Sequence, residues 1–133
     1  MIYVDETDEK ALDTALFRAS RAYEGFLAPA KSCESFEERV ANFAKMFVGR
    51  GEPGAAEIMA NVFNPDYLLK HDLVFIGSPA TVSAKIRAAA EAGLFNTFMG
   101  EFNFADLPEP ELMRSIRLFG EQVIPALRAY EPF

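Results

Sequence analysis

The sequence has little cysteine, histidine or tryptophan and no long apolar run. Its 133 residues include one cysteine (Cys33), one histidine (His71) and no tryptophan. A single cysteine excludes an internal disulfide, which is typical of proteins in a reducing compartment. One histidine and one cysteine do not supply the ligand spacing of a zinc site, so we expect no metal. No apolar run approaches the roughly 18 residues that span a bilayer, so we expect no membrane partner.

Basic residues are also in the minority. The chain has 13 lysines and arginines against 20 aspartates and glutamates, a net charge of −7. A phosphate backbone would be repelled on average, so we expect no nucleic-acid partner. The opening MIYVDETDEK lacks the basic and apolar regions of a signal peptide. These features favour a soluble cytoplasmic protein, and the length suits a single domain over 1–133.

The second half of the chain shows alternating strand and helix patterns. The apolar run 73–76 is typical of a strand buried on both faces, and 94–99 is a second strong strand candidate. A short β-prone run also occurs at 2–4. Helical patterns follow each of these runs, and this order is typical of consecutive βα units. We therefore predict an α/β fold with about three parallel strands in sequential order.

The helices are predicted from their apolar spacing and their capping residues. Thr7 or Asp8 is a suitable N-cap for a first helix, and Ser78 with Pro79 is suitable for the helix after the second strand. The segment 31–66 is predicted to be a helical insertion. It contains a Ser35–Glu38 capping box, the breaker GRGEPG at 49–54, and a short helix at 55–63 that stops at Asn64-Pro65.

The last helix is predicted to begin near Pro108 or Pro110. Its apolar residues at helical spacing are predicted to share one side of the helix: Leu112, Ile116, Phe119, Val123 and Leu127. Pro125 lacks an amide hydrogen and is predicted to kink the final turns.

Two stretches carry a resemblance to a known family. GSPATVSAKIRAAAEAG at 77–93 and FNFADLPEPELMRSIRLFGEQVIPALR at 102–128 resemble the bacterial luciferase-like flavin monooxygenases, and YVDETDEKA at 3–11 is similar to that family's sixth strand and helix start. The resemblance implies a flavin-dependent oxidoreductase with FMN or a deazaflavin as cofactor. It also implies strands six to eight of a (β/α)₈ TIM barrel. Strands one to five, which supply most flavin and substrate contacts in that family, have no counterpart here.

The predicted cofactor-binding residues are Gly77, Ser78, Gly100 and Glu101. Gly77 and Ser78 form a turn from a strand to a helix N-terminus, where free amides and the helix dipole favour a phosphate. The alternative is that they only make the turn and cap the helix. Gly100 and Glu101 follow the last predicted strand, where barrel enzymes place their active sites. Glu101 is either an acid–base group or a solvated loop carboxylate.

The remaining candidates have simpler interpretations, and we assign no catalytic residue. The phenylalanines around the last strand either stack on a flavin ring or pack in the core: Phe95, Phe98, Phe102 and Phe104. His71 is either a proton shuttle or an ordinary loop histidine. Cys33 has no basic neighbour in the sequence that would activate it as a nucleophile.

Three sequential strands would leave both edges of the sheet open, which predicts a homo-oligomer, most simply a dimer. Three functional hypotheses follow. The chain is a luciferase-like monooxygenase portion that is not catalytic alone and depends on a reductase for reduced flavin. Alternatively, it is a non-catalytic dimerising scaffold. The third hypothesis is a small-ligand-binding module with its site across a dimer interface.

Overall fold

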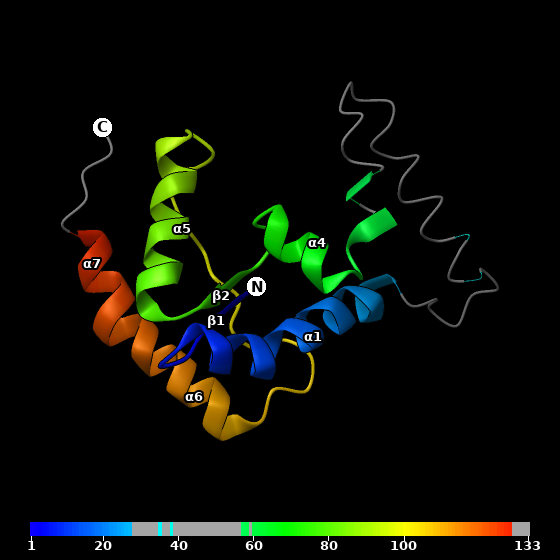
Figure 1. Cartoon of the computed structure of the whole chain (residues 1–133), viewed down its shortest axis with the longest axis horizontal. Coiled ribbons are helices and arrows are strands. Elements are labelled where there is room, and N and C mark those ends of the chain that lie inside the picture. Colours follow the sequence, from blue (N-terminus) through cyan, green and yellow to red (C-terminus); the bar gives the residue numbers. More distant parts are fainter. Residues whose placement is uncertain (28–34, 36–37, 39–56, 59, 129–133) are drawn as a thin grey trace.

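The computed structural model describes residues 1–27, 35, 38, 57, 58 and 60–128, with side chains of 24–27 excepted. In chain order its elements are β1 (Ile2–Val4), α1 (Asp8–Leu27), α4 (Pro65–Lys70), β2 (Phe75–Gly77), α5 (Pro79–Glu91), α6 (Glu109–Leu118), the π-helical turn η1 (Phe119–Val123) and α7 (Ile124–Arg128). Figure 1 shows α6, η1 and α7 as one continuous helix beside the strands. None of the described helices is both long enough and apolar enough to cross a membrane.

Among the residues that the structure describes, the sheet has two strands, so the prediction of three sequential strands and a partial TIM barrel is wrong. β1 and β2 pair in parallel, with Ile2 opposite Phe75 and Val4 opposite Gly77. The predicted strand at 94–99 forms bends instead, and Leu94 and Met99 are 73% and 93% exposed. A run of apolar residues becomes a strand only where a neighbouring strand and covering layers receive it, and the described residues supply neither on that side.

The outer edge of β1 is closed by two different acceptors. The amide of Ile2 donates to the carbonyl oxygen of Glu101 over 2.9 Å. The amide of Val4 donates to the Ser115 hydroxyl of α6, also over 2.9 Å. The segment after the expected third strand is therefore bonded to β1 through Glu101, on the side away from β2. A helix side chain takes the place that a continuing strand would need.

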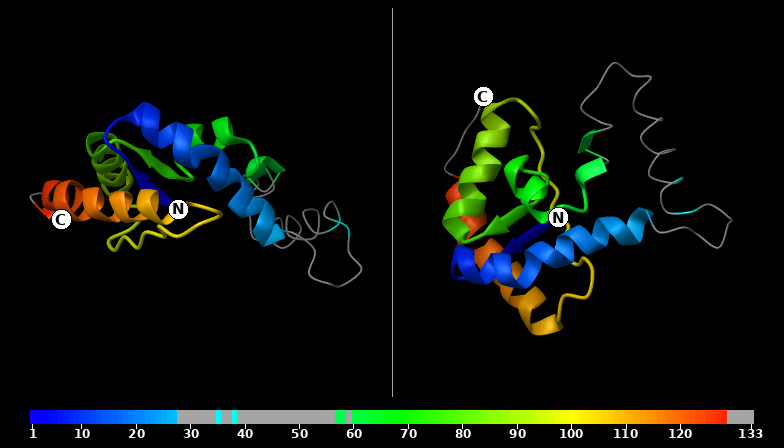
Figure 2. Two further views of the ribbon diagram at one scale, coloured as in Figure 1. Left: turned by 90° about the horizontal axis from the view of Figure 1, so that it is seen from below. Right: turned by 45° about the vertical axis from the view of Figure 1, so that its right-hand side comes forward.

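Apolar clusters cover the two faces of the sheet. Tyr3 and Ile76 pack against the alanine-rich face of α1, together with Leu68 of α4. Ile2 and Val4 face the other way and pack against α5 and η1. Figure 2 shows the strands lying between α1 and the α6–α7 helix. The small core residues of α1, namely Ala11, Ala15 and Ala19, are fully buried, so this helix lies close to the sheet.

Several predicted helix starts are confirmed. The Thr7 hydroxyl accepts from the amide of Lys10 over 3.2 Å, as expected of an N-cap. Ser78 caps α5 by accepting from the amide of Thr81 over 3.3 Å. The capping box is present as well: the Ser35 amide donates to Glu38, and the Glu38 amide donates to the Ser35 hydroxyl. The rest of the predicted helix after Ser35 lies outside the described residues, as does the 49–54 breaker.

The predicted helix stop at Asn64-Pro65 is confirmed, and the same residues also begin the next helix. The helical residues described before this point end at Asn61, and Pro65 is the first residue of α4. The Asn64 side-chain oxygen accepts from the amides of Asp66 and Tyr67 over 3.0 and 3.4 Å. Asparagine at the N-cap followed by proline at the first helical position suits a helix start.

The last helix differs from the prediction in its inner face. Ser115 and Val123 are fully buried, whereas Ile116 is 42% exposed. Where a kink was predicted from Pro125, the helix contains a π turn: the amide of Ile124 donates to the carbonyl oxygen of Phe119. A proline lacks the amide for a regular bond and crowds the carbonyl of the preceding turn, so a wider turn is accommodated there.

Candidate functional site

The carboxyl ends of both strands meet at one end of the sheet, where parallel α/β folds place their ligands. Asp5 follows β1 directly, and Gly77 with Ser78 closes β2. The side chain of Asp5 is 1% exposed. A carboxylate this deeply buried requires partners, and those partners define the candidate site.

Asp5 is held by Arg114 of α6. The Nε atom of Arg114 donates to Oδ1 over 3.2 Å, and Nη2 donates to Oδ2 over 2.8 Å. The Tyr3 hydroxyl donates to Oδ2 over 3.1 Å, and the Glu6 amide donates to Oδ1 over 2.8 Å. We call Tyr3, Asp5 and Arg114 the clamp. Two parallel bonds from a guanidinium to a carboxylate fix both the distance and the orientation of the helix relative to the strand.

The protonation states of the clamp follow from burial and hydrogen bonding. Burial alone would raise the pKa of Asp5, but the bonds from Arg114, the Glu6 amide and Tyr3 outweigh it and leave that pKa below its usual value. Burial and the neighbouring Asp5 carboxylate raise the pKa of Tyr3. Asp5 is therefore ionised and Tyr3 neutral at physiological pH, and both oxygens of Asp5 are already bonded.

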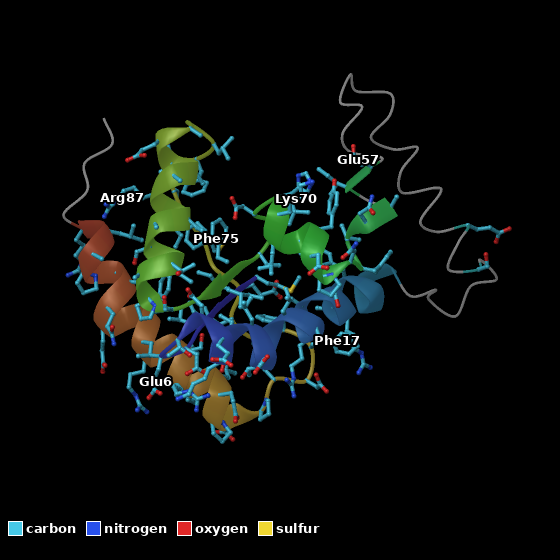
Figure 3. All side chains as sticks on the ribbon, in the orientation of Figure 1. Glu6, Phe17, Glu57, Lys70, Phe75 and Arg87 are labelled. Atoms are coloured by element: carbon cyan, nitrogen blue, oxygen red, sulfur yellow. The ribbon has the colours of Figure 1, made fainter. Side chains whose placement is uncertain are left out.

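A polar groove of about 450 Å³ borders the clamp and is lined by Asp5, Glu6, Lys10, Asp13, Thr14 and Arg114. Its cations are already engaged: Lys10 pairs with Glu6 over 2.5 Å, and Arg114 pairs with Asp5. Glu6, which lies in the bend between β1 and α1, is labelled in Figure 3. The groove therefore offers no unpaired cation for an anionic ligand among its lining residues. Within the described ranges no cluster of three metal-ligating side chains occurs.

The predicted phosphate position at Gly77 and Ser78 is occupied by a side chain of the same protein. Oδ1 of Asp8 accepts from the Ser78 amide over 2.6 Å, and Oδ2 accepts from the Thr81 hydroxyl over 2.9 Å. These bonds, the Ser78 amide first, hold the pKa of Asp8 below its usual value. A Cβ atom on Gly77 would lie 2.9 Å from Asp8 Oδ1 and 2.8 Å from Thr81 Cγ2. Glycine is therefore required here for close packing.

This arrangement does not fit a flavin phosphate at the turn. The Ser78 amide is already bonded, and the Asp8 carboxylate brings a negative charge to the place where the phosphate would bind. A phosphate would have to displace Asp8 or accept a repulsive neighbour. The structural interpretation of Gly77 and Ser78, as a turn and a helix cap, matches the contacts that these residues make.

Gly100 and Glu101 lie at the other end of β1, beside Ile2. The structure therefore does not bring them together with Gly77 and Ser78. Glu101 is exposed and lines a shallow hollow of about 380 Å³ whose other walls include Arg21, Asn103 and Phe104. The space around Gly100 is narrow, since a Cβ there would lie 3.3 Å from Ile2 Cδ1.

The remaining sequence candidates mostly take structural positions. Phe104 is buried in the core beneath α1, and Phe75 meets Phe98 edge-on with ring centres 5.3 Å apart. Phe102 meets Phe119 in the same way at 5.1 Å. His71 forms the C-cap of α4 and lies 4.2 Å from the Tyr67 ring. Cys33 lies outside the described residues.

Sequence reasoning missed the clamp. Asp5 and Arg114 occur only within the stretches 3–11 and 102–128 that carry the family resemblance, and neither was singled out as a site residue. The available signal was positional: a carboxylate directly after a buried strand lies at the ligand-binding end of a parallel sheet. Its partner, 109 residues away, has no local signature.

Comparisons of the chain with protein-family models, with curated proteins and with solved structures give no match.

Proposed function

We propose that the chain is a non-catalytic, self-associating portion of a luciferase-like flavin-dependent oxidoreductase. The observation that carries this proposal is the closure of the sheet's carboxyl end by the chain's own side chains. The Arg114 guanidinium donates to the Asp5 carboxylate, and the Asp8 carboxylate accepts from the Ser78 amide. A flavin, as FMN or a deazaflavin, would then be bound only after assembly with further protein, and a separate reductase would supply it in reduced form.

The properties of Asp5 support the non-catalytic part of the proposal. A general base works best with a pKa near the operating pH and with a free lone pair toward the substrate. The pKa of Asp5 lies below the usual carboxyl value, and its oxygens accept bonds from Arg114, Tyr3 and the Glu6 amide. Such a group stabilises the fold and is a poor proton acceptor.

Exposed apolar side chains support the self-associating part. Three large apolar residues of the last helix are exposed: Met113, Ile116 and Ile124. Exposed apolar side chains that form a contiguous patch mark a surface that binds another protein. The edge of β1 is already used by Glu101 and Ser115, and Ile76 in β2 is 2% exposed. We therefore expect helices to supply the contact surface in place of sheet edges.

The lone cysteine favours the cytoplasm as the site of action.

A small-ligand-binding module is the second candidate, and the hollow beside Glu101 favours it. Its volume of about 380 Å³ falls within the range of roughly 300–1,000 Å³ that is typical of ligand pockets. Arg21 and Glu101 provide one charge of each sign at its wall, and Phe104 provides an apolar surface. In this second candidate, a flavin would occupy the hollow and contact Glu101.

Titration with FMN, oxidised and reduced, separates the two candidates. The primary proposal predicts no change in flavin fluorescence or absorbance on addition of the isolated chain. The matched variants are Asp8→Ala, which frees the Ser78 amide, and Glu101→Gln, which alters the hollow. Saturable binding by the unaltered chain that Glu101→Gln abolishes would overturn the primary proposal in favour of the second candidate.

A further inference from the structure

The α6–η1–α7 helix has one face in the core and a second, apolar line outside it. The inner residues recur every four positions: Ser115, Phe119, Val123 and Leu127. A second line lies one residue further along the chain: Ile116, Gly120, Ile124 and Arg128 also recur every four positions, and Met113 precedes Ile116 by three. The π turn sustains this spacing, because it inserts one extra residue and keeps Ile124 aligned with Ile116.

We define the outer stripe as Glu109, Met113, Ile116, Gly120, Ile124 and Arg128. Its three large apolar members are 50%, 42% and 37% exposed in chain order. A Cβ atom on Gly120 would meet nothing within 4 Å, so the middle of the stripe is open. Both charged ends are exposed. The stripe is thus apolar in its centre, small at one position, acidic at its start and basic at its end.

The charge order selects the occupant and its direction. A second copy of this helix placed antiparallel brings Glu109 against Arg128 of the partner subunit, and the reverse pair forms at the other end. The same alignment puts Met113 opposite Ile124 of the partner subunit, since each lies four residues in from its end. Antiparallel helix dipoles also attract at both ends. A parallel copy would instead place like charges together.

We propose that two copies of the chain dock through the outer stripe, antiparallel, about a twofold axis near the middle of the stripe. Gly120 of each copy lies beside Ile116 of the other, so the missing side chain accommodates the larger one. This inference rests on the self-association in the proposed function and names its surface. The contact is isologous, so it closes at two copies and does not extend into a filament.

The size of the stripe sets the expected affinity. A helix of this length extends about 30 Å, and one such contact is smaller than the roughly 800 Å² per partner of a standard stable interface. The expected dimer is therefore weak and in exchange with monomer, with a dissociation constant in the micromolar range. Sedimentation velocity over a wide concentration series is the appropriate measurement.

The first test replaces an apolar member of the stripe. Ile116→Glu is expected to weaken the dimer by more than about tenfold, because a carboxylate would be buried at the contact. Phe17→Glu is the matched control: Phe17 is 66% exposed on α1, outside the stripe, and is labelled in Figure 3. The control is expected to dimerise like the unaltered chain. Circular dichroism of each variant confirms that the helices remain.

The second test reverses the charges at the ends. Glu109→Arg and Arg128→Glu are each expected to weaken the dimer, and the double variant is expected to regain it. A double variant that is weaker than both single variants would overturn the antiparallel arrangement. A dimer that none of these substitutions affects would overturn the inference and leave the proposed function standing. A chain that stays monomeric at all concentrations would overturn both.

Discussion

Replacing Arg114 with methionine tests whether the clamp fastens the last helix to the sheet. Methionine retains the aliphatic length, while Asp5, whose side chain is 1% exposed, loses bonds of 3.2 and 2.8 Å. Breaking a buried ion pair from one side costs about 3–5 kcal/mol. Because the Arg114 side chain is 39% exposed and water can partly replace it, we expect a loss of about 2–3 kcal/mol in the free energy of unfolding.

The pH dependence of this loss is a second signature. The folded pKa of Asp5 is depressed, so its stabilising contribution is present above the unfolded value of about 3.9 and declines as pH falls through the folded pKa. In Arg114→Met burial of the carboxylate dominates, which raises the folded pKa and makes the variant relatively more stable in acid. The cost of the substitution should therefore be larger at about pH 7 than at about pH 4.

Urea unfolding followed by circular dichroism at both pH values measures this difference. Arg117→Met, an exposed arginine on the same helix, is the control and is expected to change stability by less than about 0.5 kcal/mol. A loss as small for Arg114→Met, or a loss equal at the two pH values, would refute the structural role assigned to the clamp.

Two further substitutions test the edge and the turn of the sheet. Ser115→Ala leaves the buried amide of Val4 without its acceptor at 2.9 Å and should lower the free energy of unfolding in urea by about 1–3 kcal/mol. Unfolding indistinguishable from that of the unaltered chain would show that another group accepts this amide. Gly77→Ala places a Cβ within 3 Å of Asp8 and Thr81 and should cost about 1–3 kcal/mol, and retention of full stability would mean that the turn relaxes freely.

The parts of the fold that could be predicted from sequence depend on local chemistry. The caps at Thr7 and Ser78 and the Ser35–Glu38 box act within one helical turn, so their residue types suffice to locate them. The strand at 2–4 was located with its bounds, and the one predicted at 73–76 was located two residues early at its start, since β2 spans Phe75–Gly77. Apolar β-prone residues flanked by polar residues and turns have few alternatives.

The parts that could not be predicted depend on distant neighbours. The run at 94–99 has strand-like composition, but pairing requires a neighbouring edge, and Ser115 and Glu101 had taken the available edge of β1. The inner face of the last helix was misplaced by one residue at Ile116. The side of this helix that faces the sheet is set by the hydrogen bond from the Val4 amide to Ser115 and by the π turn before Pro125. The spacing of apolar residues in the sequence predicts neither feature.

The place of the candidate site was predicted only in part. Gly77 and Ser78 lie at the carboxyl end of β2, as expected, whereas Gly100 and Glu101 lie beside Ile2 at the other end of β1. The sequence did not indicate that Asp8 would bond the Ser78 amide, since an aspartate at a helix start ordinarily serves its own helix. Seventy residues separate the two in the chain, and only the packing of α1 beside β2 brings them together.

Sedimentation velocity of the chain with FMN in the same cell, recorded at the protein and flavin wavelengths, tests the central claim most directly. The account predicts that the protein sediments as a concentration-dependent dimer while FMN remains with the slow, free boundary. Flavin that moves with the protein at one molecule per chain, in a species that stays monomeric at every concentration, would contradict the account.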